Sequence, residues 1–197
     1  MGVEKRLDRQ CEQMTLYTVQ TDQVLQTLRQ DGFYYVKRAY VSQKYEESAS
    51  AFLNAYRWYA KQASQIVARP PEAESAVWAF CRAEYLECHP GSHLLTLNVP
   101  LAECVFFRMQ DWNQILNLRY LGRNEEEKQA FEKKLERQGV PYEGDVYTTP
   151  FYPLLQRELL ESWRNLFRYD AQVKKTGNPL FADMQVGLWL LDQNWLG

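Results

Sequence analysis

The sequence predicts an α+β fold with a mixed or antiparallel sheet core and several surrounding helices. Three apolar runs with the character of strands lie between residues 75 and 117, so most of the sheet is expected there. Further strand patterns occur near both ends of the chain, and helical patterns lie between them without regular alternation. This order is typical of α+β proteins and not of doubly wound ones.

The N-terminal end predicts an extension followed by a strand. Residues 1–13 carry alternating charges and little that could be buried, so we interpret them as a flexible extension. Residues 14–197 are then expected to form a single domain, which is a usual size for one core. Residues 16–20 alternate apolar and polar side chains, as a half-buried strand does.

A short helix and a second strand are expected next. Thr21 or Asp22 can cap this helix, and Gly32 can end it in a left-handed conformation. Residues 33–41 are rich in aromatic and β-branched side chains, which favour a strand.

One long helix is predicted over residues 42–69. Apolar side chains recur there at steps of three and four, and two prolines at 70–71 remove the donors that would continue the helix. Three aromatic residues crowd positions 56–59, so at least one of them is expected to line a cleft or a second contact surface.

The central region predicts three strands and a helix. Residues 77–81 are apolar on both faces, which suits an interior strand, and the strand predicted over 104–109 is apolar on both faces until Arg108. In the strand 95–99, apolar side chains alternate with Thr96 and Asn98. Asp111 is expected to cap the following helix, with a glutamine three residues later in a capping-box arrangement.

The C-terminal third predicts two helices separated by a loop, and then a last strand. Residues 124–138 carry strong helix signals: an Asn at the cap position, acidic residues at the start and basic residues at the end. A helix is therefore predicted there. Residues 140–152 are expected to form a long irregular loop, which is often functional. A helix over 153–169 follows, and residues 184–191 read as a strand with two apolar faces.

The composition excludes several classes of protein. A net charge of -2 argues against an extended nucleic-acid surface, and four cysteines in 197 residues are too few for a disulfide scaffold. The first residues lack a signal peptide and no window reaches the ~20 apolar residues of a membrane span. We therefore expect a cytoplasmic protein without membrane contact.

The central region contains cysteine and histidine side chains that are candidates for a metal site or a nucleophile. Cys81, Cys88, His89 and His93 lie close in sequence, but their spacing is not that of a common zinc site, so no metal is predicted. A nucleophile pairing Cys88 or Cys104 with either histidine is the alternative, although adjacent residues seldom face each other. Cys81 and Cys104 are expected to be inert members of the core.

The turn before the strand 95–99 leaves two alternatives open. Ser92 and His93 stand at the mouth of this strand, where they could hold a small anion or an amide. Otherwise Ser92 bonds to the local backbone and His93 packs at the end of the strand.

Five segments together resemble an uncharacterised bacterial family whose members carry a domain of unknown function. The family pattern has an LYTIQT-like opening strand, a PIWAF-like strand, a DWxxxLN helix and a late VQxxLW strand. The matching segments are residues 16–21, 77–80, 89–99, 108–117 and 184–189. The resemblance implies family membership for nearly everything after Met14, and it brings no established activity.

The chain is more distantly similar to the ADP-ribosyltransferase fold. That similarity implies a nucleotide-sized cleft for NAD, in which a polar residue of the first strand, Thr18 or Gln20, anchors the ribose. Trp78 and His93 would line the same cleft, and the late-strand position that holds a glutamate in that fold is occupied by Gln185. A neutral amide cannot stabilise an oxocarbenium ion, so catalysis is in doubt even if NAD binds.

The competing hypothesis is a non-catalytic protein-interaction module. Aromatic residues make up 14% of the chain, and they gather at positions 56–59 and in the loop 142–152. Exposed aromatic surfaces of this kind are typical of binding sites for protein partners.

Overall fold

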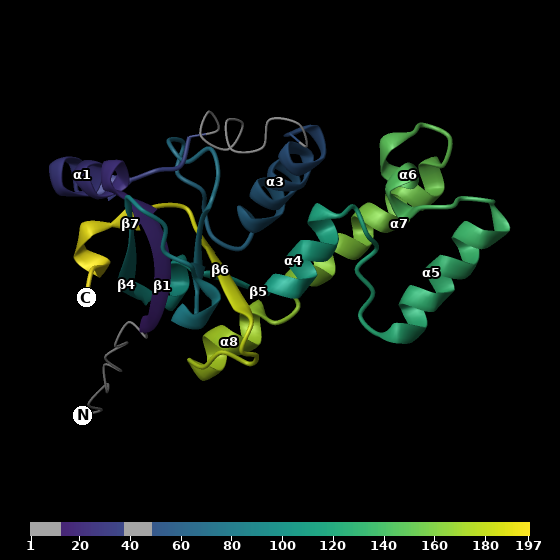
Figure 1. Ribbon diagram of the computed structural model, residues 1–197. Helices are drawn as coiled ribbons and strands as arrows, with labels where there is room; N and C mark the ends of the chain where they lie inside the picture. The colour runs from purple at the N-terminus through teal and green to yellow at the C-terminus, as the bar shows by residue number, and fades with distance from the viewer. Residues whose placement is uncertain (1–12, 38–48) are drawn as a thin grey trace, which may run out of the picture.

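A computed structural model, which describes residues 13–37 and 49–197, contains a five-stranded antiparallel sheet. The order across the sheet is β4 (Ser92–Pro100), β1 (Gln13–Thr21), β3 (Val77–Phe80), β6 (Met184–Leu188) and β5 (Val105–Arg108). Every pair of neighbours is antiparallel, so the α+β prediction is confirmed and the mixed sheet is ruled out. Figure 1 shows the strands gathered at one end of the molecule and the helices α5 to α7 at the other.

The sheet draws on both ends of the chain. β1 pairs with β4 along its whole length, from Gln13 beside Pro100 to Thr21 beside Ser92. The last long strand, β6, lies between β3 and β5, where every one of its residues is buried. A separate two-stranded sheet joins β2 (Phe33–Tyr34) to β7 (Leu191–Asp192).

Two hydrophobic cores cover the two faces of the sheet. On one face, α1 (Asp22–Asp31) and α8 (Asp170–Thr176) pack on the apolar residues of β1, β4 and β6. On the other face, α3 (Ala49–Ala63) and α4 (Met109–Leu116) bring a large aromatic cluster onto β3 and β5. The predicted alternation of β4 is confirmed, because Leu97 and Val99 are buried while Thr96 and Asn98 are exposed.

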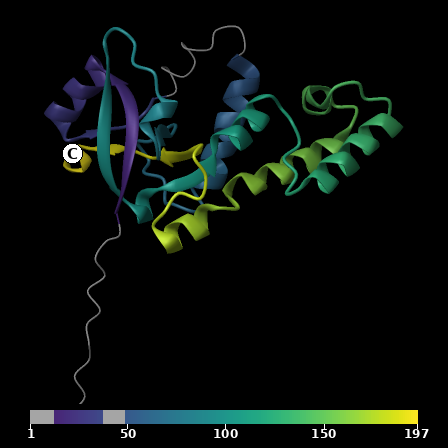
Figure 2. The same ribbon diagram turned by 60° about the horizontal axis from the view of Figure 1, so that its bottom comes forward.

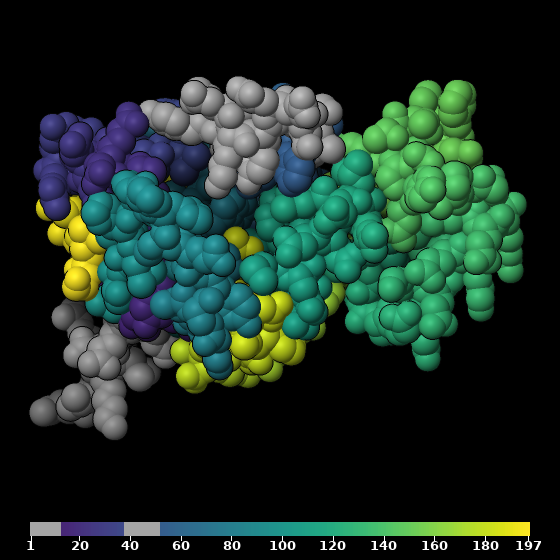
Figure 3. Space-filling model, viewed as in Figure 1, coloured from purple at the N-terminus to yellow at the C-terminus, as the bar shows by residue number. Residues whose placement is uncertain are grey.

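The aromatic core continues away from the sheet into a helical lobe. Its members are α5 (Glu125–Arg137), α6 (Glu143–Thr148), α7 (Pro153–Ser162) and the 3-10 helix η3 (Trp163–Phe167). Phe131 of α5 and Leu159 of α7 belong to the same buried cluster as Tyr59 of α3. The space-filling view shows this lobe projecting from the rest of the molecule (Figure 3). The remaining short 3-10 helices are η1 (Ala83–Tyr85), η2 (Leu101–Glu103) and η4 (Gln193–Trp195).

Several helix signals in the sequence are confirmed and others are corrected. Gly32 ends α1 with a φ of 78°, and Asn124 caps α5 by accepting from the N–H of Glu127 at 2.9 Å. Thr21 stands at the start of α1 but its side chain makes no capping hydrogen bond. Asp111 does not cap α4, which begins two residues earlier; its carboxylate is buried in an ion pair.

The strand and loop predictions need three further corrections. The predicted loop 140–152 contains α6, and the predicted strand 184–191 is divided into β6 and β7. The strand predicted over 33–41 is limited to Phe33–Tyr34 within the described residues, followed by an isolated bridge at Val36. Residues 1–12 and 38–48, which hold most of the predicted extension and parts of two predicted elements, lie outside the described residues; Gln13 already belongs to β1.

Candidate functional site

A cavity of about 590 Å³ opens where β1 and β3 separate. The two strands share one paired position, Tyr17 with Phe80, after which β1 continues along β4 and leaves β3. Residues 18–21 of β1 and residues 75–78 therefore line opposite sides of the gap. Three of the five predicted site residues, Thr18, Gln20 and Trp78, lie in this lining.

A chain of polar groups bridges the separated strands. The hydroxyl of Thr18 donates to the carbonyl of Trp78 at 2.9 Å, in the place where a backbone ladder bond would otherwise form. The side-chain amide nitrogen of Gln20 donates to the Thr18 oxygen at 2.8 Å. Thr18 is only 1% exposed and fixes the amide nitrogen of Gln20 through this bond, and the Gln20 side chain lines the cavity.

The remaining lining is aromatic and polar, with little charge. Four aromatic residues contribute to it, and the indole N–H of Trp78 donates to the hydroxyl of Tyr56 at 3.2 Å. Thr27 of α1 and the buried Ser75 add hydroxyl groups. Among the described residues that line the cavity there is no lysine or arginine; the ionisable groups other than tyrosine are the exposed Glu87 and His89.

His93 lies on the other side of β1 from the gap. It pairs with Gln20 across β1 and β4, but its Nε2 atom lies 2.7 Å from a carboxylate oxygen of Asp22 and it lines a different hollow. Ser92 bonds to the local backbone, since its hydroxyl donates to the carbonyl of His89 at 2.8 Å and accepts from the His89 N–H. Ser92 therefore bonds to the local backbone, which is one of the two alternatives predicted for it. Neither Ser92 nor His93 is among the residues that line the cavity.

Gln185 is also separate from the cavity. It sits in the centre of the sheet, opposite Phe80 of β3 and Phe107 of β5, and is 5% exposed. Its amide oxygen is buried with no hydrogen-bond partner among the described residues. The sequence therefore predicted three residues that the structure brings together and two that it leaves apart, and it missed Ser75, Thr27 and Glu87.

Cys81 and Cys104 lie in surroundings that disfavour reaction, whereas Cys88 is exposed. Burial raises the pKa of the Cys81 thiol to about 12, and burial raises the pKa of Cys104 as well. A thiol with a raised pKa holds little of the thiolate that acts as a nucleophile. Within residues 13–37 and 49–197, no three His, Cys, Asp or Glu side chains gather as metal ligands would.

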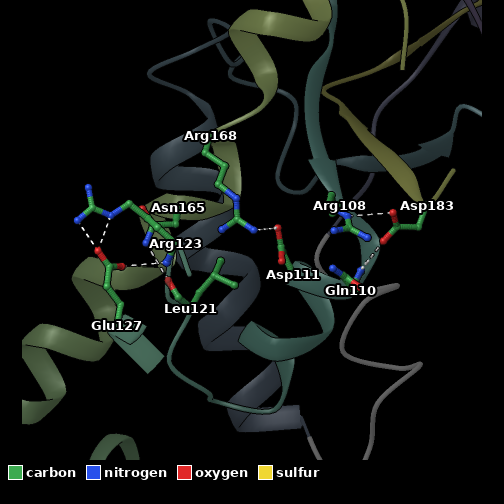
Figure 4. A network of polar contacts seen from close by, with 9 residues as sticks. All are labelled: Arg108, Gln110, Asp111, Leu121, Arg123, Glu127, Asn165, Arg168 and Asp183. Carbon is green, nitrogen blue, oxygen red and sulfur yellow. Dashed lines mark hydrogen bonds and ion pairs between the residues drawn. The ribbon is translucent and has the colours of Figure 1, made fainter. Parts of the chain in front are cut away.

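Two ion pairs with little exposure lie where β5 meets α4, and none of their residues belongs to the cavity lining (Figure 4). Arg108 contacts Asp183 at 3.0 Å, and Arg168 contacts Asp111 at 3.0 Å. Burial raises the pKa of Asp111, and the guanidinium of Arg168 opposes that shift. Each pair balances one positive and one negative charge: Arg108 and Asp183 join β5 to the residue before β6, and Arg168 and Asp111 join the end of η3 to α4.

The aromatic residues divide between core and surface. Tyr59 is 1% exposed within the core, Tyr56 and Trp58 are half-buried, and Tyr56 lines the cavity, as expected of at least one of these three residues. Tyr142 and Phe151, from the region predicted as a loop, are 73% and 78% exposed, and Leu154 beside them in sequence is 78% exposed.

Comparison with family models gives one match, a domain of unknown function, DUF3841, over residues 15–196. The chain belongs to the DUF3841 family. The matched residues include all of the cavity lining and every strand of the sheet apart from Gln13 and Met14 of β1, so the predicted membership is confirmed. Comparisons with curated proteins and with solved structures found no match.

The predicted similarity to ADP-ribosyltransferases finds no support in these comparisons. None of the helices in the described part of the chain has the length and apolar character needed to cross a membrane.

Proposed function

We propose that this DUF3841 protein binds a small ligand of the nucleoside class, NAD included, in the cavity between β1 and β3. The observation that supports this most directly is the separation of the two strands, with Thr18, Gln20 and Trp78 gathered around the gap. A volume of about 590 Å³ lies within the range of sites that enclose small organic molecules.

The lining suits a flat ring that also forms hydrogen bonds. Aromatic side chains offer apolar faces and edges to a heterocyclic base. The amide oxygen of Gln20 can accept from a base or an amide, and the hydroxyls of Ser75 and Thr27 can bond to a sugar. The backbone N–H of Trp78 points toward β1, on the same side as the backbone carbonyl that accepts from Thr18. In an antiparallel strand the N–H and C=O of one residue face the same neighbour.

The charge of the lining limits what part of a nucleotide is recognised. Phosphate binding relies on arginine, lysine or a cluster of backbone N–H groups, and the described lining has no basic residue other than His89. We therefore expect the base and sugar to be held while phosphates extend into solvent. NAD and a plain nucleoside should then bind with similar affinity.

The proposed activity is binding without ADP-ribosyl transfer. Gln185 is neutral and sealed in the sheet, so it offers no negative charge to a reacting ribose. Glu87 is the single carboxylate among the described lining residues, and it stands exposed at the rim.

Calorimetric titration of the purified protein with adenosine, nicotinamide riboside, NAD and ADP-ribose tests the proposal. At least one nucleoside should bind, and Gln20→Ala should weaken its binding by about two- to tenfold, as the loss of one hydrogen bond does. Gln129→Ala, on the exposed surface of α5, is the matched control and should bind normally. Absence of heat and of thermal stabilisation with all four compounds would contradict the proposal, as would equal affinities for Gln20→Ala and wild type.

A second candidate function is protein recognition by the helical lobe. The observation that favours it is the exposure of Tyr142, Phe151 and Leu154, since large apolar side chains exposed in sequence proximity are typical of partner surfaces. Replacing Phe151 and Leu154 by Ser should release a co-purified partner while leaving the melting temperature unchanged. A partner that stays bound to the double variant would remove this candidate.

A further inference from the structure

The outer edge of β4 already accepts a short added strand from the chain itself. The N–H of Gly197 donates to the carbonyl of Thr96 at 3.0 Å, and Leu196 forms an antiparallel bridge with Leu97. Since β4 is the end strand of the sheet, these contacts lie on the side facing away from β1. Figure 2 shows the C-terminus lying beside the β4–β1 pair.

The next outward-facing position of β4 is Leu94. In an antiparallel strand, the N–H and C=O of alternate residues point to the same side. Thr96 points outward, as its bond to Gly197 shows, and so Leu94 and Ser92 point outward as well. The N–H of Ser92 donates to the carbonyl of His89 at 2.9 Å. Leu94 has no outward backbone partner within residues 13–37 and 49–197, so its N–H and C=O are the template for further pairing.

A hollow of about 440 Å³ accompanies this stretch of edge. Its walls come from α1, from β4 and from the C-terminal residues, and they are rich in leucine: Leu25, Leu28, Leu94, Leu95 and Leu196. Leu94 is 45% exposed and Leu196 is 38% exposed, so apolar surface borders the unpaired backbone groups.

The charges around the hollow favour an acidic occupant. Arg29 of α1 lines it and forms no ion pair with any residue in the described ranges. His93 in the same lining is occupied by Asp22. The hollow thus combines leucines with one cation that a carboxylate of an incoming segment can neutralise.

We propose that the β4 edge binds an extended peptide from a protein partner, as an added antiparallel strand. The peptide continues the pairing begun by Leu196 and Gly197, exchanges hydrogen bonds with the Leu94 backbone, and carries apolar side chains with a carboxylate near Arg29. Main-chain bonds supply affinity in this mode of recognition, and the side-chain hollow supplies selectivity. The site is independent of the cavity between β1 and β3.

Selection of a random twelve-residue peptide library against the full chain tests the proposal. Enriched peptides should alternate apolar residues and contain Asp or Glu. Fluorescence anisotropy then compares synthetic copies of these peptides on two variants of one residue. Leu94→Ala keeps the outward N–H and should weaken binding by a few-fold, whereas Leu94→Pro removes it and should weaken binding at least tenfold. Proline is tolerated here because this N–H faces away from β1.

Hydrogen exchange of the wild-type protein gives a readout that does not depend on the proline variant. Peptide binding should slow exchange of the Leu94 amide, and Arg29→Gln should weaken acidic peptides more than neutral ones. The proposal is overturned by a selection without enrichment, by peptides that leave Leu94 unprotected, or by equal affinity of Leu94→Ala and Leu94→Pro. A concentration-dependent dimer that Leu94→Pro abolishes would show that a second copy of the chain is the occupant, which also overturns it.

Discussion

At the scale of single residues, Gly187 of β6 lies directly against the side chain of Tyr59, which occupies the space that a larger residue would need. A Cβ atom at this position would overlap the hydroxyl oxygen of Tyr59 and would lie 2.9 Å from its Cζ atom. Tyr59 itself is sealed in the core, and its hydroxyl has no hydrogen-bond partner among the described residues. The sheet and α3 therefore approach each other closely because residue 187 has no side chain.

Gly187→Ala is expected to lower the free energy of unfolding by about 3 kcal/mol, at the upper end of the cost of overpacking a core. Tyr59→Phe alone should be neutral or slightly stabilising, because it removes a buried hydroxyl that no described partner satisfies. Combined with Gly187→Ala, it should recover part of the loss by removing the overlapping oxygen. Urea denaturation of the four proteins checks this cycle, and equal losses with and without the Tyr59 hydroxyl would contradict it.

The buried pair of Asp111 and Arg168 makes a prediction about pH. Their side chains are 6% and 23% exposed, and burial raises the pKa of Asp111 while Arg168 lowers it. A carboxyl whose pKa is higher in the folded state binds its proton more tightly there, so its ionisation removes stability as the pH rises through that pKa. Arg168→Leu takes away the compensating cation and should raise this pKa further.

Arg168→Leu should lower the free energy of unfolding by about 3 kcal/mol at pH 7, because it leaves the buried carboxylate of Asp111 without a compensating charge. The loss should shrink as the pH falls and Asp111 becomes protonated. Adding Asp111→Asn should recover stability at pH 7 and remove most of the pH dependence of the loss. Both effects can be measured by thermal and urea unfolding between about pH 4 and pH 8. This range begins near the ordinary pKa of an aspartate and extends above neutral pH. A loss that is constant with pH would show that packing, and not charge, dominates the pair.

At the scale of elements, α5 was predicted from its local signals because those signals act within one helix. Asn124 caps it, and Glu127 returns a second bond by accepting from the N–H of Arg123 at 2.9 Å. Asn124→Ala should lower stability by about 1 kcal/mol, the usual contribution of such a cap. Faster hydrogen exchange in the first turn of α5 and a lower urea midpoint are the expected readings, and Gln129→Ala on the same helix should show neither. An unchanged midpoint in Asn124→Ala would mean that the cap contributes nothing.

Elements that depend on distant packing were harder to predict. The segment of α6 contains Gly144 and Asp145 and is followed by Pro150, residue types common in turns, so the sequence indicated a loop. It forms a helix because Val146 is completely buried in the core that α7 also joins. Similarly, aspartate is a common N-cap residue, so the sequence favours that role for Asp111. Its ion pair depends on Arg168, which is distant in sequence and is brought close only by the fold.

The candidate site shows the same division. Alternation along β1 identified Thr18 and Gln20 as polar residues of a strand, and this is a local property. The cavity, however, exists because β1 and β3 share a single paired position, which no local pattern specifies. In β6 both faces are buried, so periodicity could not show that Gln185 lies within the core and away from the cavity.

At the scale of the whole molecule, the two ends of the chain complete the sheet. β1 lies between β4 and β3, and β6 lies between β3 and β5, so the order of strands requires both termini to be in place. Contacts such as the hydrogen bond of Thr15 with Asn98 join positions 83 residues apart. Such pairings are formed late, because closing long loops is opposed by chain entropy until the contacts exist.

Removing residues 184–197 should therefore abolish cooperative folding and not merely weaken it. β6 supplies Met184, Val186 and Leu188, all fully buried, and without it β3 and β5 each lose a neighbour in the middle of the sheet. We expect the shortened chain to bind a hydrophobic dye and to melt without a sharp transition, as partly folded states do. The matched control ends at Trp195 and loses only Leu196 and Gly197, which pair with the outer edge of β4, so it should keep a cooperative transition. A sharp melting transition in the chain that lacks β6 would contradict its central place in the sheet.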